Sequence, residues 1–187
     1  MPKTYHADER FESIGTAELG KEYDGCSFAS CDLAGADLSE IVFVDCRFES
    51  CNLSSANVAG TAFRNVTFDS CKLLGVRFDL CSDFLFEVAF SESILDSSSF
   101  YECRLKETAF VKCRMRDVDL TGADLNLAEF DECDLSDAKF ENTDLRNADL
   151  CSSFNYVLDP ELNKVKNAKF SLAGIVGLLQ KYEIVVE

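Results

Sequence analysis

The sequence predicts a stacked-repeat fold, and three observations support this prediction. A bulky apolar residue or Tyr recurs at every fifth position over most of the chain. A second column, made mostly of small residues, lies two positions before each bulky one. Both prolines, Pro2 and Pro160, fall outside these columns, where a missing N–H breaks no ladder hydrogen bond. A period of five fits neither an α-helix nor an ordinary strand, so it indicates units that stack to bury their apolar side chains.

The bulky column forms two series with one interruption between them. The first series is Tyr23, Phe28, Leu33, Leu38, Phe43, Phe48, Leu53, Val58, Phe63, Phe68, Leu73 and Phe78. The second is Phe90, Leu95, Phe100, Leu105, Phe110, Met115, Leu120, Leu125, Phe130, Leu135, Phe140, Leu145 and Leu150. Each unit therefore gives one large and one small side chain to the interior and leaves three mostly polar ones outside.

Three units carry the same triplet of residues in this frame: Ala36-Asp37-Leu38, Ala123-Asp124-Leu125 and Ala148-Asp149-Leu150. With this motif, A-(D/N)-L-x-x, the chain resembles the pentapeptide-repeat family from about Tyr23 to Phe154. The resemblance implies an all-β fold, a right-handed quadrilateral β-helix in which four units make one coil. We expect about six to seven coils, followed by a C-terminal α-helix. At the spacing of paired strands, this stack would be about 30 Å long.

The interruption predicts a small insertion. With four units per coil, residues 20 positions apart should stack, as Phe28, Phe48 and Phe68 do in the sequence pattern. Phe78 and Phe90 are 12 positions apart instead of 10, so two extra residues lie near 83–87. We expect a bulge or short loop that keeps the faces aligned on either side. The predicted organisation is an N-terminal lead-in and cap over 1–22, the β-helix over 23–154, and a C-terminal capping and dimerisation module over 155–187.

The C-terminal segment is expected to leave the five-residue register after Phe154. Ser171 is a suitable N-cap for a helix that continues to about Tyr182, and Ile184–Val186 follows as a short strand. A solenoid needs its open end covered, and this helix offers more apolar surface than a cap requires. We therefore expect it to form a homodimer interface through four residues: Leu172, Ile175, Val176 and Leu179.

The cysteines and the histidine argue against metal or catalytic chemistry. Eight of the ten cysteines occupy the small inward position, Cys81 continues that phase, and a buried thiol there acts as a small apolar group. The chain has no C-x-x-C pair and one histidine, His6. We expect no metal, no cofactor and no enzymatic site, with metal or redox use of the thiols as the weaker alternative. Reduced thiols, a polar N-terminus and no apolar run of membrane-spanning length favour a cytoplasmic protein that does not contact membranes.

Charge is the main functional signal. The net charge is −16, and residues 117–149 hold eleven acidic residues against Lys139 and Arg146. Seven acids on the face built on Phe28, Phe48 and Phe68 are the predicted partner-binding residues: Glu49, Asp69, Glu92, Glu129, Asp131, Glu132 and Asp149. The opposite face is nearly as acidic through Asp37, Glu40, Asp79, Glu102, Asp119 and Glu141. A motif preference for Asp and the solubility of a negative surface are one explanation.

Mimicry of DNA is the other explanation. Duplex DNA carries about one charge per 1.7 Å of axis, so 30 Å would carry roughly 18 charges. This rod would carry a comparable density, which favours a basic DNA-binding channel of another protein as partner and disfavours direct binding of nucleic acid.

The tail carries a second resemblance. Three segments resemble the C-terminal module of the albicidin-resistance and microcin-immunity pentapeptide proteins: Phe154-Asn155-Tyr156, Lys169-Phe170-Ser171-Leu172 and Leu178-Leu179. The closing helix and Ile-Val-Val strand are also similar to the Qnr quinolone-resistance proteins. The resemblance implies a homodimer that binds DNA gyrase or topoisomerase IV as a DNA mimic and modulates it or protects it from toxins or quinolones. Some Qnr proteins carry long loops that project from the coils. This chain departs from them, because it has only the two-residue insertion near 83–87.

Two classes of function therefore remain. The first is the non-catalytic acidic DNA mimic that binds gyrase or topoisomerase IV. The alternative is a rigid interaction scaffold for a partner other than a topoisomerase, using one face of the rod or the 83–87 bulge.

Overall fold

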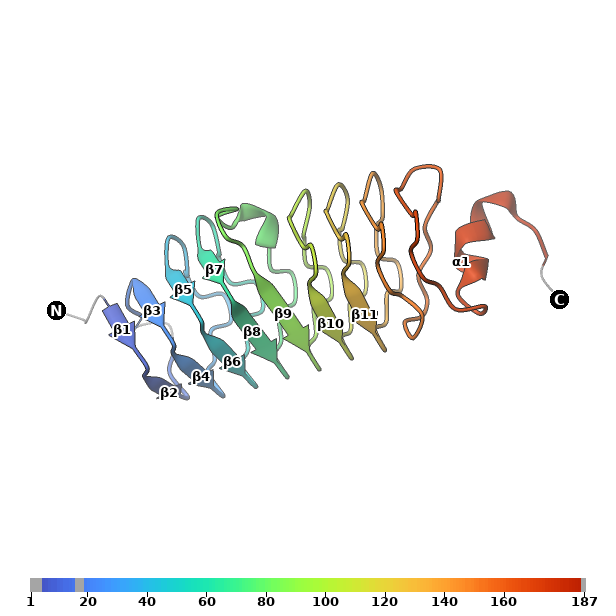
Figure 1. Ribbon diagram of the computed structural model, residues 1–187. Helices are drawn as coiled ribbons and strands as arrows, with labels where there is room; N and C mark the ends of the chain where they lie inside the picture. Colours follow the sequence, from blue (N-terminus) through green and yellow to red (C-terminus); the bar gives the residue numbers. More distant parts are fainter. Residues whose placement is uncertain (1–4, 16–18, 186–187) are drawn as a thin grey trace.

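The computed structural model describes residues 5–15 and 19–185. The chain winds into an elongated solenoid of about six turns, with the N-terminus at one end and one short helix at the other (Figure 1). Strand pairing is parallel throughout the two sheets. The β-helix expected from the five-residue period is confirmed.

Each strand is short because it spans only one side of a coil. One side is a four-stranded sheet in the order β1 (Tyr5–Ala7), β3 (Glu22–Asp24), β5 (Val42–Val44) and β7 (Ala62–Arg64). The next side is a seven-stranded sheet of β2 (Arg10–Glu12), β4 (Ser27–Ala29), β6 (Arg47–Glu49), β8 (Val66–Asp69), β9 (Val88–Ser91), β10 (Ala109–Val111) and β11 (Glu129–Asp131). We call the outer surface of this second sheet, continued to Asp149, the acidic face.

The remaining two sides are held by single parallel bridges instead of named strands. One column of bridges joins Asp32, Asn52, Lys72, Ile94, Arg114, Asp134 and Phe154, and another includes Arg77, Ser99, Asp119 and Lys139. At corners the backbone enters the left-handed region, as at Ser30, Ser50 and Ser70, whose φ angles are 52°, 53° and 55°. Small polar residues tolerate this conformation better than β-branched ones, so the corners favour Ser, Asn, Asp and Gly.

The register confirms the two-residue insertion. Phe48 pairs with Phe68, 20 positions on, whereas Phe68 pairs with Phe90, 22 positions on. The 3-10 helix Phe78–Leu80 and the loop that follows it absorb the extra residues. The 20-residue register then resumes from β9 to β10 and from β10 to β11.

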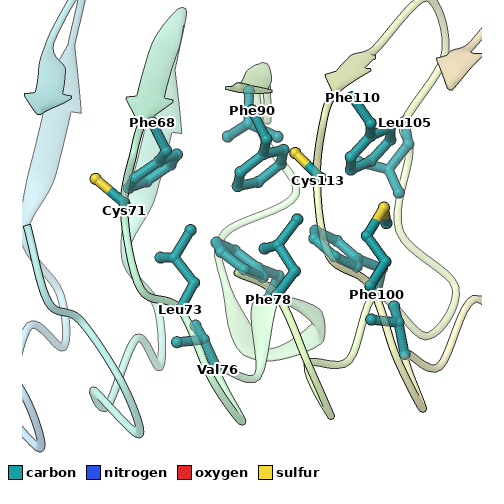
Figure 2. Packing of buried hydrophobic residues seen from close by; sticks show 14 of the residues in the cluster. Phe68, Cys71, Leu73, Val76, Phe78, Phe90, Phe100, Leu105, Phe110 and Cys113 are labelled. Carbon is teal, nitrogen blue, oxygen red and sulfur yellow. The ribbon is translucent and has the colours of Figure 1, made fainter. Parts of the chain in front are cut away.

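The interior is a stack of aromatic rings with small residues between them (Figure 2). The rings of Phe48, Phe68 and Phe90 lie parallel, with centroids 5.1 and 5.3 Å apart. Stacked parallel strands bring equivalent side chains within about 5 Å, which suits offset ring stacking. Cys71 and Cys113 lie between the rings as small apolar groups, as predicted. All ten cysteines are free thiols.

The N-terminal segment contributes more than a lead-in. His6 in β1 stacks on Tyr23 with ring centroids 5.0 Å apart, and Phe11 in β2 stacks on Phe28 at 5.1 Å. These two rings cover the first complete coil, so part of 1–22 extends the ladder itself.

The C-terminal segment differs from the expected one in four respects. The ladder does not end at Phe154, because Asp144 pairs with Lys164 and Asp149 pairs with Lys169. The helix α1 spans only Ile175–Leu179 and continues as a 3-10 turn to Tyr182. Ser171 precedes a turn instead of capping the helix directly, and its hydroxyl accepts a hydrogen bond from the Gly174 N–H at 2.9 Å. Ile184 and Val185 form no strand, and Val186 lies outside the described residues.

Candidate functional site

The seven predicted partner-binding acids all lie on the acidic face, but at different kinds of position. Glu49 and Asp69 end β6 and β8, and Glu129 and Asp131 are the outward residues of β11. Asp149 lies one coil after Glu129 and forms a parallel β-bridge with it. Glu92 and Glu132 follow their strands at corners, with φ angles of 49° and 53°. Six of the seven residues form two groups, and Glu92 lies alone between them in the middle of the face.

The first group is largely neutralised. Arg47 lies beside both Glu49 and Asp69, and its guanidinium nitrogens are 2.6 Å and 2.9 Å from the two carboxylates. One guanidinium between two acids leaves about one net negative charge at this end of the face, and ion pairs this exposed contribute little to stability. The sequence pattern predicted the acids here but not the arginine that bridges them.

The middle of the face is nearly uncharged. The outward residues of β9 are Ala89 and Ser91, and those of β10 are Ala109 and Val111. Glu92 is the one predicted acid in this stretch. The acidic face is therefore not a continuous row of carboxylates.

The second group is the strongest concentration of charge among the predicted residues. Glu129, Asp131, Glu132 and Asp149 lie on two adjacent coils, and we call them the carboxylate cluster. Glu129 and Asp131 are both exposed and belong to one three-residue strand. Three of the four, Glu129, Asp131 and Asp149, line a shallow hollow of about 420 Å³ with Phe130 and Ser152.

Two lysines mark the edges of this cluster. Lys169 Nζ is 2.9 Å from Asp149, and Lys112 Nζ is 4.0 Å from Glu132. The N–H of Cys151 and then the ammonium of Lys169 hold the pKa of Asp149 below its usual range, so this carboxylate is ionised at neutral pH. Asp131 accepts a hydrogen bond from the Ser152 hydroxyl at 2.8 Å. The cluster keeps a net negative charge after these contacts.

The neighbouring side, the column that includes Arg114 and Asp134, is balanced by ion pairs. Arg114 lies 2.7 Å from Asp96, and Arg116 lies 2.7 Å from Asp134. Much of the basic stretch before residue 117 is therefore used to neutralise acids in adjacent coils. The carboxylate cluster therefore differs from the neighbouring side, because it keeps a net negative charge where the acids of that side are paired with arginines.

Burial makes two of the thiols poor nucleophiles. Burial raises the pKa of Cys46 and of Cys103 to about 12, so both are protonated at neutral pH. Among residues 5–15 and 19–185, no group of three or more His, Cys, Asp or Glu side chains is arranged to hold a metal ion. In the same residues, no helix has both the length and the apolar character needed to cross a membrane.

The four predicted dimer residues lie at the end of the rod. Leu172 is 89% exposed, and Ile175 and Val176 are about half exposed, at 44% and 48%. Leu179 is partly buried, while its neighbour Leu178 packs against the core. Tyr182, Ile184 and Val185 extend the exposed apolar surface beyond the predicted four. A surface of this kind on a single chain is typical of an interaction site.

Two solved structures of a known protein agree with the architecture. No curated protein sequence matches this chain. Trypsin-treated variants of QnrB1, described as a plasmid-mediated fluoroquinolone resistance protein, have similar structures, with TM-scores of 0.66 and 0.65. They are 18% and 19% identical; each match covers 98% of this chain and 100% and 97% of the other. HetL, a heterocyst-regulation protein of the cyanobacterium Nostoc, matches with a TM-score of 0.34 and 15% identity, over 88% of this chain and 84% of its own.

A family model described as the pentapeptide repeat region matches residues 22–82 and 82–154. These two stretches meet at the position of the insertion and include the columns of bulky and small residues that line the interior. The chain belongs to the pentapeptide-repeat family.

Proposed function

We propose that this chain is a non-catalytic, acidic DNA mimic that binds DNA gyrase or topoisomerase IV and modulates or protects it. The observation that carries the proposal is the carboxylate cluster of Glu129, Asp131, Glu132 and Asp149 on two adjacent coils. The rigid ladder fixes these charges in rows about 4.8 Å apart, so little ordering is needed when a basic channel binds them. Such a channel is the surface that normally takes the phosphates of duplex DNA.

The remaining predicted acids have lesser roles in this proposal. Glu49 and Asp69 already form ion pairs with Arg47. These two acids would therefore contribute to partner binding mainly after Arg47 turns toward solvent or toward the partner. Glu92 lies between the two groups as an isolated charge. We therefore expect most of the binding energy to come from the cluster.

The position of the cluster near the C-terminal end connects it with the proposed dimer. A homodimer formed through Leu172, Ile175, Val176 and Leu179 would place the clusters of two chains on either side of the joint. The result would be a longer acidic rod than one chain provides. Solved structures similar to this chain belong to a fluoroquinolone resistance protein, which supports the choice of a type II topoisomerase as partner. Binding such a partner would require the chain to be in the cytoplasm.

The experiment compares two triple charge reversals in a gyrase supercoiling assay across a salt series. The first variant carries Glu129→Lys, Asp131→Lys and Glu132→Lys. The control carries Glu40→Lys, Glu102→Lys and Glu141→Lys on the opposite face, where all three residues are exposed. We expect wild type and control to act on gyrase with an effect that weakens as salt rises, and the cluster variant to lose it.

The proposal fails if wild type has no effect on gyrase or topoisomerase IV at micromolar concentrations, with or without a quinolone. Equal loss in both variants, with folding intact, would mean that net charge alone matters and that the cluster is not the site. Circular dichroism of each variant separates these outcomes from unfolding.

A further inference from the structure

The loop at the insertion replaces one strand of the solenoid. The four-stranded sheet ends at β7 (Ala62–Arg64), and the same column resumes only at Arg104, which pairs with Asp124. The register places Lys106 two coils beyond Arg64, since steps of 22 and 20 residues separate them. The coil between them leaves the wall and forms the loop 82–87, which is drawn in green beside β7 and β9 in Figure 1.

This missing strand leaves backbone donors without acceptors. In complete coils the corner residue donates to the next coil, as the Asp45 N–H does to Arg64 O at 2.9 Å. The residue before each bulky one donates to the preceding coil, as the Asp124 N–H does to Cys103 O at 2.9 Å. Within the described parts of the chain, the equivalent N–H groups of Asn65 and Arg104 form no hydrogen bond. Both residues line a hollow of about 480 Å³ between the two coils.

Two arginines beside the hollow also lack acidic partners. Neither Arg64 nor Arg104 forms an ion pair within the described residues, although the chain has a net charge of −16. The Arg64 guanidinium lies over the ring of Phe84, 5.3 Å from its centroid, and its Nε is buried without a hydrogen-bond partner. Arg104 is exposed and lines both this hollow and a second one of about 430 Å³ on the other side of Phe86.

The loop adds an apolar tip to these donors. Phe84 and Leu85 are each 63% exposed, whereas Phe86 is half-buried and packs toward Phe78 with ring centroids 6.4 Å apart. Phe86 therefore anchors the loop, and Phe84 and Leu85 project from it. Two adjacent large apolar side chains this exposed are typical of a contact surface.

We propose that this surface, made of the loop 82–87 with Arg64, Asn65 and Arg104, is a docking site for an extended acidic peptide segment of a partner protein. Carboxylates of the segment bind Arg64 and Arg104, its carbonyls accept the free N–H groups, and an apolar side chain packs on Phe84 and Leu85. Of the acids around the two hollows, Glu107 is paired with Lys106 at 3.1 Å and Asp79 is paired with Arg77. The acids that oppose an acidic ligand are Asp83, Glu87 and Glu102.

A peptide fits this surface better than nucleic acid does. The donors are few and lie beside apolar side chains, whereas DNA presents a long row of phosphates to a chain that is strongly negative. The hollow reaches the acidic face at Thr67, Ala89 and Ala109, but none of the four acids of the carboxylate cluster lines it, so the inference does not rest on the proposed function.

The experiment is selection from a phage-displayed random peptide library on the full chain, with counter-selection on the Arg104→Glu variant. We expect enriched peptides to combine Asp or Glu with an aromatic or aliphatic residue. Their affinity should fall at least about tenfold in Arg104→Glu and in Phe84→Ser. The matched control is Lys21→Glu/Lys72→Glu, which changes two exposed lysines elsewhere and should leave binding unchanged.

Amide NMR of the protein with a peptide bound provides the second readout, because the N–H signals of Asn65 and Arg104 should shift downfield as these groups gain acceptors. The proposal is wrong if no peptide depends on Arg104, or if a dependent peptide leaves both amide signals unmoved. Binding of a labelled DNA duplex that requires Arg104 would also overturn it and assign the surface to nucleic acid.

Discussion

The Tyr156 side chain fills the space into which a side chain at Gly174 would project. A methyl group on Gly174 would overlap the Tyr156 hydroxyl oxygen, and one on Gly177 would overlap the Tyr156 carbonyl oxygen. Tyr156 itself is only 2% exposed, and the Leu158 N–H donates to Gly177 O at 3.3 Å. The two glycines that weaken α1 as an isolated helix are therefore what allow it to pack closely on the last coil.

Substitution of either glycine should release this end of the rod. We expect Gly174→Ala or Gly177→Ala to cost about 1–3 kcal/mol in docking of the helix, because Tyr156 is fixed in the core and cannot move aside. Hydrogen exchange should become faster over 175–182 while the strands keep their protection. Gly15→Ala is the control, since no atom lies within 4 Å of its added methyl. Unchanged exchange over 175–182 would show that the contact does not hold the helix.

Dimerisation can be tested on the exposed apolar residues of the same region. We expect Leu172→Glu/Ile175→Glu to give a folded monomer, because two charges would have to be buried without partners in the interface. Light scattering measures the mass, and circular dichroism checks the fold. Leu85→Glu, at a residue that is 63% exposed on the loop, should leave the mass unchanged. A monomeric wild type, or an unchanged dimer in the double variant, would contradict the proposed interface.

The interior could be predicted almost completely from the sequence. The period of five places Phe28, Phe48, Phe68, Phe90 and Phe110 in one column, and the structure pairs them in that order. This part is predictable because only inward residues have a strict size requirement, and a ladder repeats it in every coil. The two-residue excess was visible in the sequence for the same reason.

The last coil was missed because two of its positions depart from the pattern. Tyr156 takes a buried place one residue later than expected, and Asn163 stands where a small apolar residue is usual. The Asn163 side chain is tolerated because its amide donates to Phe140 O at 2.8 Å and its oxygen accepts from the Thr143 N–H at 2.9 Å. Val165, Ala168 and Phe170 continue the columns of Leu145, Ala148 and Leu150, which is a signal that sequence reading could have used.

The acidic face could be predicted as a set of positions but not as a charge distribution. Which carboxylates are neutralised depends on side chains that reach across coils, such as Arg47 to Asp69, 22 residues away. Long flexible side chains can choose among several partners, and the five-residue period does not specify the choice. The division of the face into two groups therefore required the structure.

The aromatic stack predicts that truncating one of its side chains strongly lowers the stability of the fold. Phe68 lies between Phe48 and Phe90 and is 1% exposed, so Phe68→Ala leaves a cavity that the rigid coils cannot close. We expect a loss of about 3–5 kcal/mol in the free energy of unfolding, measured by urea denaturation. Phe84→Ala, at an exposed ring, should cost less than about 1 kcal/mol. Similar losses in both variants would mean that the stack does not determine stability.

The lowered pKa of Asp134 predicts how the free energy of unfolding changes with pH in the acid range. Burial of this carboxyl raises its pKa, but hydrogen bonds from Ser136, Asn155 and Arg116 outweigh burial and lower the pKa to about 2. The unfolded chain has a pKa of about 3.9, so the carboxylate stabilises the fold above that pH and the contribution disappears as pH falls through about 2.

We expect Asp134→Asn to lose about 1–2 kcal/mol at neutral pH, since Arg116 is solvent-exposed and its charge is screened. The difference from wild type should shrink between about pH 4 and pH 2, as measured by urea denaturation across pH. Asp32→Asn is the matched control, because Asp32 lies in the same column and forms no ion pair within the described residues. A difference between wild type and Asp134→Asn that stays constant down to pH 2 would contradict the assignment, because the stabilisation would then come from packing of the side chain and not from its charge.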